Sequence, residues 1–423
     1  MPHNIDWKHT IPLFFFIAAI ALSPSFNFGY VPGTGRVLEI RVEDILLVIF
    51  GLAWIISWFA SRKHTFIKPP LWGPIFLWLS IGLATTLLNL ILSNIQLGRA
   101  FFYFLKEIEF FVLYFFIFYH IKSLDAAKVL MNFWFILAFI NVSWVIYQFA
   151  VGIKVGGSVA YGPSAIPEAE GPLPSGGFFL LLFIFIFNLF IYYYSGLSIS
   201  KVKKFILLIA VLSLMIGIVS SGSRTSVLSL GFAIVIIPIL YLMKRGGVKA
   251  SAITLLMFIM LAGSFYYFIG SKQATRGYHL NPVEVVAGLE GGRTWVWKNQ
   301  VNAFLKHNQL YLLFGMGKSV SPVYEESHSQ YVRNFIETGI IGSLVFFFLI
   351  GMILKKTLHE FARGKDPFLV ALCAGAFVST LAMLVMAIAA EVFLSVKIDE
   401  IYWSLTALTM AVISLHKEKR IIE

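Results

Sequence analysis

One histidine and two arginines in this sequence have side chains that could act on an anionic substrate. His328 stands in the run Ser327-His328-Ser329-Gln330-Tyr331, where a polar stretch ends and an apolar run begins. A neutral imidazole at such a junction can serve as a general base. Ser327 or Ser329 can cap the helix that follows. The alternative is a histidine that only anchors this helix at a membrane interface.

The two arginines lie where an anion could bind. Arg224 belongs to the short run Ser220-Ser221-Gly222-Ser223-Arg224-Thr225 between two apolar stretches, and Arg293 follows two glycines at the start of a segment with helical periodicity. A guanidinium among Ser and Gly backbone N–H groups suits a diphosphate, and a helix N-terminus favours an anion. The alternative for both is a side chain that extends to lipid headgroups.

Membrane helices must position these residues. The chain has 423 residues, of which 59% are hydrophobic and 13% charged, a composition that excludes an ordinary soluble domain. Apolar runs of about 20 residues mark spanning helices. We therefore expect an all-α polytopic protein, one membrane-embedded domain over residues 1–423, with about twelve transmembrane spans. They are placed at residues 10–24, 43–60, 70–93, 97–119, 128–151, 177–195, 204–220, 225–243, 249–270, 331–354, 367–390 and 399–415.

The basic residues predict the orientation. Net charge is +12, and most Lys and Arg fall in short loops after alternate spans. Under the positive-inside rule both termini are cytoplasmic, so the charge needs no nucleic-acid partner. Residues 152–176 and 271–330 then form a smaller and a large outer loop. In the large loop, residues 293–305 predict an amphipathic helix on the membrane surface, with one apolar face made of Trp297, Val301, Phe304 and Leu305.

The fourth predicted span is unusual because it contains charges, which are costly inside a bilayer. Arg99, Tyr103 and Glu107 share one helical face. We expect that face to line a substrate cavity, together with Ser223, Gln330 and Tyr331. The alternative is a set of structural ion pairs inside the bundle, of which Lys106 with Glu109 and Arg333 with Glu337 are examples at helical spacing.

Several kinds of chemistry find no support in the sequence. The five aspartates are scattered at positions 6, 44, 125, 366 and 399, and the single cysteine is Cys373. There is no glycine-rich phosphate loop with Lys-Ser/Thr and no His or Cys ligand motif. We therefore predict no metal and no cofactor, and a substrate that arrives already activated.

Taken together, these motifs resemble the bacterial O-antigen ligase and O-antigen polymerase superfamily over roughly residues 205–345. The segments that carry the resemblance are Ser221-Gly222-Ser223-Arg224-Thr225, Gly292-Arg293-Thr294-x-x-Trp297, Leu313-Phe314-Gly315-Met316-Gly317, His328-Ser329-Gln330-Tyr331 and Glu337-Thr338-Gly339 with Gly342. The Arg41-x-x-Asp44 start of the second span is also similar.

The resemblance implies a metal-independent, inverting glycosyltransferase with a C-type (GT-C) membrane fold. Such enzymes transfer a glycan from undecaprenyl diphosphate to an acceptor hydroxyl at the periplasmic face of the bacterial inner membrane. By this likeness His328 is the catalytic base, and Arg224 and Arg293 hold the diphosphate. One departure is that residues 152–176 carry Lys154 but no arginine.

The acceptor is left open between two main alternatives. A polymerase uses another lipid-linked glycan, whereas a ligase uses lipid A-core; a third branch glycosylates proteins. The C-terminal runs Glu391-Val392-Phe393 and Glu400-Ile401-Tyr402-Trp403 favour the polymerase. Oligomeric state is not indicated by the sequence.

Two other classes compete with this interpretation. A lipid-linked glycan transporter is compatible with many spans and intramembrane charges, but two related halves are expected in such a protein and are not visible here. A peptidoglycan polymerase would need an outer-loop aspartate, and residues 271–330 contain none.

Overall fold

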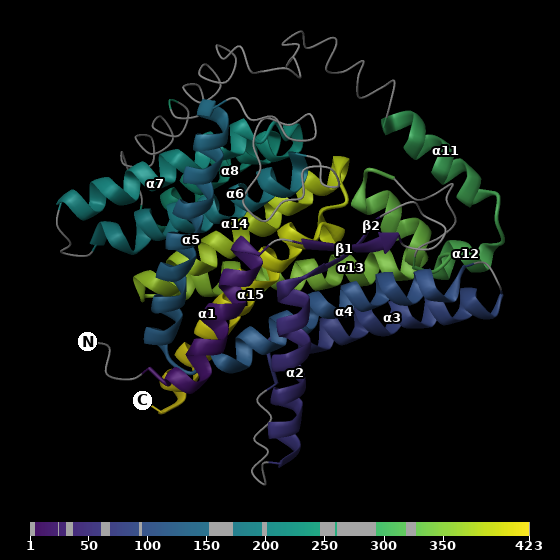
Figure 1. The fold of residues 1–423 in the computed structure, drawn as a ribbon, viewed down its shortest axis with the longest axis horizontal. Helices are drawn as coiled ribbons and strands as arrows, with labels where there is room; N and C mark the ends of the chain where they lie inside the picture. Colours follow the sequence, from purple (N-terminus) through teal and green to yellow (C-terminus); the bar gives the residue numbers. More distant parts are fainter. Residues whose placement is uncertain are drawn as a thin grey trace.

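The computed structural model describes residues 5–23, 25–30, 37–60, 68–92, 95–151, 172–196, 201–245, 259, 293–318 and 327–422. Long helices dominate these residues (Figure 1). The α-helices are α1 (Trp7–Leu22), α2 (Val42–Ala60), α3 (Trp72–Ile91), α4 (Leu97–His120), α5 (Leu124–Val151), α6 (Pro172–Tyr192), α7 (Lys201–Ser220), α8 (Arg224–Arg245), α11 (Thr294–Leu305), α12 (Gln309–Phe314), α13 (Gln330–Arg363), α14 (Pro367–Ala389) and α15 (Val396–Ile422). Short 3-10 helices are η1 (Tyr194–Gly196) and η4 (Val392–Leu394).

Eleven of the predicted spans coincide with one of these helices, and the span predicted at 249–270 lies outside the described residues apart from Ile259. Seven described helices are long and apolar enough to cross a membrane, namely α3, α5, α6, α8, α13, α14 and α15. Two shorter apolar segments lie in α1 and α7. The protein is therefore a polytopic membrane protein, while the count of twelve spans stays a prediction.

A small β-hairpin corrects the expectation of an all-α chain. Strands β1 (Ser25–Tyr30) and β2 (Val37–Arg41) pair antiparallel, with Ser25 opposite Arg41 and Tyr30 opposite Val37. Both segments alternate apolar and polar residues, as half-buried strands do. They were overlooked because they are short and lie between two strongly apolar runs.

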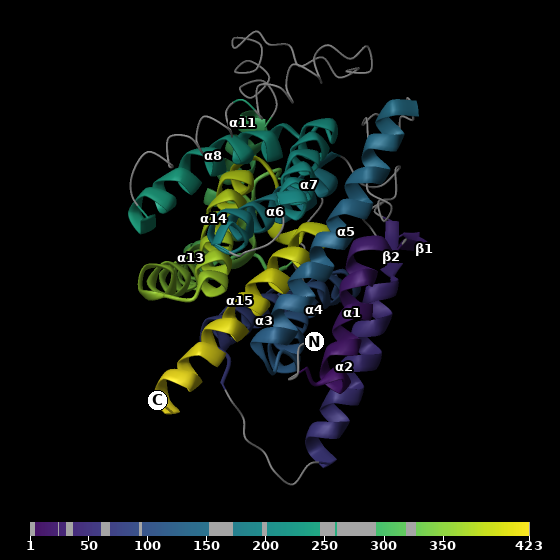
Figure 2. The same ribbon diagram turned by 90° about the vertical axis from the view of Figure 1, so that its left-hand side faces the viewer.

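The helices pack around α6 and α15. The middle of α6 is enclosed on all sides, so that Phe179, Phe183 and Phe187 are fully buried. Helix α15 runs between α4 on one side and α14 on the other (Figure 2). Helix α14 begins at Asp366, whose side chain accepts a hydrogen bond from the Leu369 N–H, with Pro367 in the first turn. These are strong helix-start signals.

Helix α13 is two helices joined at Gly339, where φ is 66°. The segment after α12 crosses this break. The N–H groups of Met316 and Gly317 donate to the carbonyls of Ile336 and Glu337, at 2.8 and 2.9 Å. At Gly315, a Cβ would lie 2.4 Å from the backbone of Glu337, so only glycine allows this approach. The crossing brings Lys318 into the bundle.

The large loop contains helices α11 and α12, and the helix predicted at 293–305 is confirmed. Its buried side centres on Phe304, which packs with Met316 of the crossing segment and Ile336 of α13. Leu305, predicted for the same apolar face, is 52% exposed, so its place against a membrane surface stays a prediction. The predicted smaller loop, 152–176, lies outside the described residues up to 171, and its last five residues already belong to α6.

Candidate functional site

Four segments meet where α14 ends: the α7–α8 turn, the start of α11, the start of α13 and the start of α6. Arg293 Nη1 donates to the Ala389 carbonyl at 2.7 Å, and the Gln330 N–H donates to the neighbouring Ala390 carbonyl at 3.2 Å. The starts of α11 and α13 are thus hydrogen-bonded to two adjacent residues at the end of α14. His328 and Arg293 therefore belong to the same end of the bundle.

A serine-rich turn presents Arg224. Gly222 adopts φ 74°, which reverses the chain between α7 and α8. The Ser223 hydroxyl accepts from the Ser226 N–H at 3.3 Å and caps α8. This turn packs directly against α6, since a Cβ at Gly176 would lie 2.6 Å from the Ser223 side chain. Arg224 follows the cap, and its side chain is exposed. Ser223 is buried within the turn, directly before Arg224.

The two arginines influence each other electrostatically. Partial burial lowers the pKa of Arg293 most, and the positive charge of Arg224 lowers this pKa further. Two guanidiniums held within range repel each other until an anion lies between or beside them. An anion with several oxygens, such as a diphosphate, would relieve that repulsion and accept their forked hydrogen bonds.

His328 is held in an unusual backbone conformation with its side chain exposed. Its φ is 51°, the one positive value of a non-glycine residue in the described part of the chain. Both neighbours are buried. The Ser327 carbonyl accepts from Trp297 Nε1 at 2.6 Å, which ties this segment to α11. Ser329 is the residue before α13 as predicted, but its hydroxyl bonds the Ala387 carbonyl at 3.4 Å and makes no cap bond.

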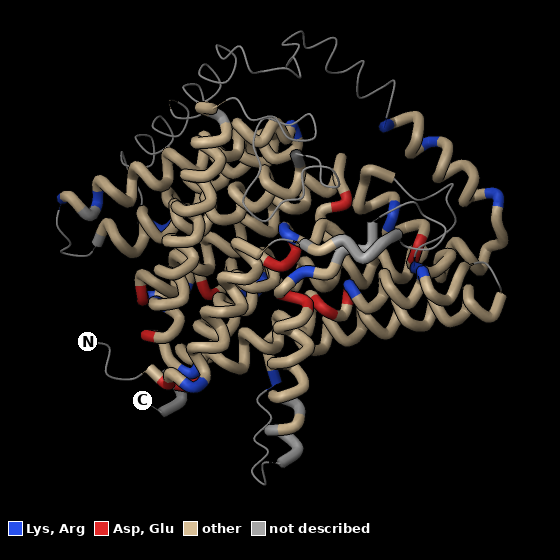
Figure 3. Tube along the Cα trace, viewed as in Figure 1, with Lys and Arg blue, Asp and Glu red and all other residues tan. Residues whose placement is uncertain are grey.

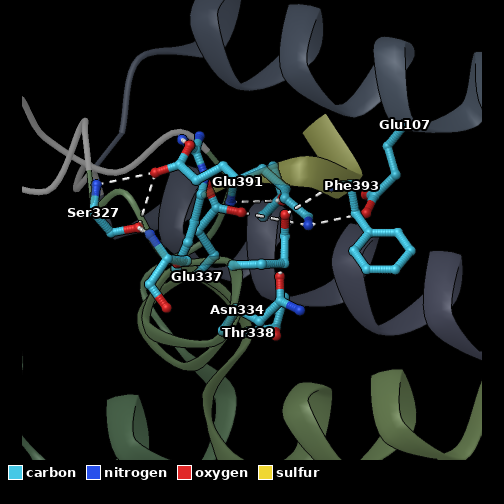
Figure 4. A network of polar contacts seen from close by, with 12 residues as sticks. Glu107, Ser327, Asn334, Glu337, Thr338, Glu391 and Phe393 are labelled. Carbon is cyan, nitrogen blue, oxygen red and sulfur yellow. Dashed lines mark hydrogen bonds and ion pairs between the residues drawn. The ribbon is translucent and has the colours of Figure 1, made fainter. Parts of the chain in front are cut away.

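Glu391 anchors the residue before His328. Its Oε1 accepts from the Ser327 N–H at 3.0 Å and from the Ser327 hydroxyl at 2.8 Å (Figure 4). Its Oε2 accepts from Arg333 at 2.6 Å. Arg333 in turn pairs with Glu337 at 2.9 Å, so the predicted i, i+4 pair is confirmed as part of a larger network.

This network continues into the bundle through Lys318. Its ammonium lies 3.4 Å from Glu337 and 3.1 Å from Glu107, and stacks over the Trp78 ring at 4.8 Å. Trp78 Nε1 also donates to Glu107 at 2.8 Å. Lys318 and Glu391 were not singled out as site residues from the sequence, because neither has helical spacing to its partners. Only the crossing segment and the turn after α14 bring them to Arg333.

The residues predicted to line a cavity divide into two groups. Glu107 and Gln330 line an internal cavity together with Lys318 and Asp399, against the rings of Trp78 and Trp403. The remaining side chains make other contacts. Tyr103 faces the Arg333 guanidinium at 5.4 Å, Tyr331 donates to the Leu384 carbonyl at 2.7 Å, and Arg99 is buried in α4.

Helix α4, the fourth predicted span, has both a face with structural ion pairs and a face that borders a cavity. Lys106 pairs with Glu109 at 2.9 Å, as predicted, and also with Asp44 of α2 at 2.8 Å. These contacts are structural, whereas Glu107 on another side of the same helix borders the cavity. One helix thus supplies an ion-pair face and a cavity face.

Fold and site together define a polytopic membrane protein with a basic, histidine-bearing site at one end of its helix bundle. Residues 208–347, about a third of the chain, match the family described as O-antigen ligase, which supports the resemblance to the O-antigen ligase and polymerase superfamily. The matched part begins in α7 and ends in α13, so it includes Arg224, Arg293 and His328. No curated protein matches the chain.

Proposed function

We propose that this protein is a glycosyltransferase that moves a glycan from undecaprenyl diphosphate to an acceptor hydroxyl, with His328 as the general base. The observation that carries the proposal is that Arg293 is hydrogen-bonded to the end of α14, near enough to Arg224 for their charges to interact, while the exposed His328 precedes α13 at the same end. The family match supports the same class of activity.

The proposed reaction uses each of these residues once. The His328 imidazole takes the proton of the acceptor hydroxyl, and the acceptor oxygen bonds to the anomeric carbon. The bond from that carbon to the phosphate oxygen breaks, and its electron pair leaves with the diphosphate. Arg224 and Arg293 stabilise the charge that develops there. Attack opposite the leaving group inverts the anomeric configuration.

We further propose that the acceptor is a second lipid-linked glycan, which makes the enzyme a polysaccharide polymerase of the GT-C type in the bacterial inner membrane. Its active site would face the periplasm. The C-terminal segment supports this choice over a ligase that uses lipid A-core, because the run Glu391-Val392-Phe393 resembles polysaccharide polymerases. Glu391 of that run also belongs to the network beside His328.

The direct test is glycan transfer by the purified His328→Ala variant in lipid bilayers. Loss of a general base lowers the rate by about 10²–10⁴-fold, and we expect that loss in kcat with the protein folded and inserted. His307→Ala is the matched control, because His307 lies in the same predicted loop, is exposed and makes an edge-to-face contact with Tyr311. Transfer at the wild-type rate by His328→Ala would refute the general-base assignment.

A further inference from the structure

A second cluster of charged residues lies apart from the His328 site, where α2, α4 and α15 meet. Asp44, Glu109 and Glu400 each direct a carboxylate oxygen into this point, and the three oxygens lie within 4.8 Å of one another. Figure 3 shows acidic and basic positions lying next to each other in the interior of the molecule. The three carboxylates come from separate elements, so their approach is invisible in the sequence, where we predicted no metal site.

Glu400 is the most deeply buried member of this cluster. Its side chain is only 2% exposed, and its Oε2 has no hydrogen-bond partner. No ion pair joins Glu400 to any base in the described ranges of the chain. A buried carboxylate without a partner is costly, and intramembrane carboxylates commonly mark ion sites.

Two of the bases near Glu400 already pair with other carboxylates. Lys106 is shared by Asp44 and Glu109, and Lys397 binds Glu43 at 2.8 Å and the Ile20 carbonyl at 2.8 Å. Arg41 is buried at the end of β2, with its backbone N–H on Asp44 at 2.9 Å.

Counted over the residues that the structure describes here, four carboxylates face three bases. The carboxylates are Glu43, Asp44, Glu109 and Glu400, and the bases are Arg41, Lys106 and Lys397. With all seven of these groups ionised, one negative charge is left over.

We propose that Asp44, Glu109 and Glu400 form a binding site for one small monovalent cation, Na⁺. Carboxylate oxygens are the ligands that hard cations prefer. Three oxygens within 4.8 Å of one another lie at most about 2.8 Å from a common centre, close to the roughly 2.3–2.6 Å at which oxygen ligands hold a hard cation. A single positive charge neutralises the cluster, whereas a divalent ion would leave an excess of positive charge. Bound Na⁺ would hold α2, α4 and α15 together.

The test is ²²Na⁺ binding to the purified full-length protein, with choline chloride keeping ionic strength constant. Wild type is expected to bind about one Na⁺ per chain and to gain thermal stability as Na⁺ replaces choline. Glu400→Gln keeps the shape of the side chain and removes its charge. This variant should bind no Na⁺, and its Tm should no longer respond to Na⁺.

Glu360→Gln is the matched control. Glu360 is a buried carboxylate at the other end of the bundle, paired with Lys417 at 3.4 Å, so its removal should leave Na⁺ binding intact. Folded wild type that binds no ²²Na⁺ would overturn the proposal. So would a stabilisation produced by Ca²⁺ or by acid but not by Na⁺. If Glu400→Gln does not fold, Asp44→Asn replaces it, and undiminished Na⁺ binding by that variant would also overturn the proposal.

Discussion

At the residue scale, His328 illustrates how a chain holds a reactive side chain in place. A left-handed backbone costs a non-glycine residue about 1–3 kcal/mol. Buried neighbours offset that cost, because Ser327 is bound by Glu391 and Trp297, and Ser329 by Ala387. The imidazole is therefore presented to the solvent from a fixed backbone, which limits the geometries available to an acceptor.

Arg224 tests the diphosphate role at the same scale. Arg224→Lys keeps the positive charge and loses the forked pair of donors. We expect weaker donor binding by roughly 10- to 100-fold, the equivalent of one charged hydrogen bond of about 1.5–3 kcal/mol. Donor titration of transfer rates measures this change.

Arg363→Lys serves as the control for Arg224→Lys. Arg363 is the last residue of α13, at the end of that helix opposite to His328, and its side chain is exposed. An unchanged donor affinity in Arg224→Lys would contradict the assignment of this arginine to the diphosphate.

At the scale of elements, the crossing of α13 by the Gly315–Gly317 segment decides where Lys318 goes. Gly339 opens α13, and Gly315 lets the two backbones touch. Asn89 of α3 supports the segment from the other side by donating to the Gly315 carbonyl at 3.2 Å. Lys318 then reaches Glu107 and Glu337, so a backbone crossing sets the charge network behind His328.

Gly315→Ala should break this crossing. A Cβ there would meet the Glu337 backbone at 2.4 Å, and φ of 77° adds strain of about 1–3 kcal/mol. We expect a lower Tm, measured by thermal unfolding in detergent. We also expect a loss of transfer activity, measured by glycan transfer. Gly351→Ala is the control in α13, because nothing lies within 4 Å of the added Cβ. Equal Tm values for the two variants would show that the crossing is not needed for the fold.

At the scale of the whole molecule, the candidate groups gather at one end while the Asp44–Glu109–Glu400 cluster lies within the bundle. Helices α6 and α14 connect these regions to the rest of the core, and both are almost entirely apolar and buried. A rigid core of this kind lets the site be assembled from turns and helix starts without moving the helices themselves.

Polymerase activity is a property of the whole molecule, so it is best tested in cells. In a host lacking its own polymerase, this chain should restore long lipid-linked polymer, detected by glycan electrophoresis. The His328→Ala chain should not. Capping of lipid A-core in a host lacking its ligase would show a ligase instead. Failure in both hosts, with the protein present in the membrane, would speak against both acceptors.

The amino-acid sequence was sufficient to predict the membrane class, eleven of the described helices and the residues that could do chemistry. Apolar runs of about 20 residues must become helices in lipid, because every backbone polar group has to be bonded internally. Local spacing likewise predicted the Arg333–Glu337 and Lys106–Glu109 pairs.

Which of these residues lie next to one another could be seen only in the folded chain. Glu391, Lys318 and Arg333 are far apart in sequence, and so are Asp44, Glu109 and Glu400. Their approach depends on a backbone crossing at Gly315, on the turn after α14 and on the packing of α15 against α4. No periodicity records such contacts, because they arise from the order in which helices pack and not from the faces that each helix presents.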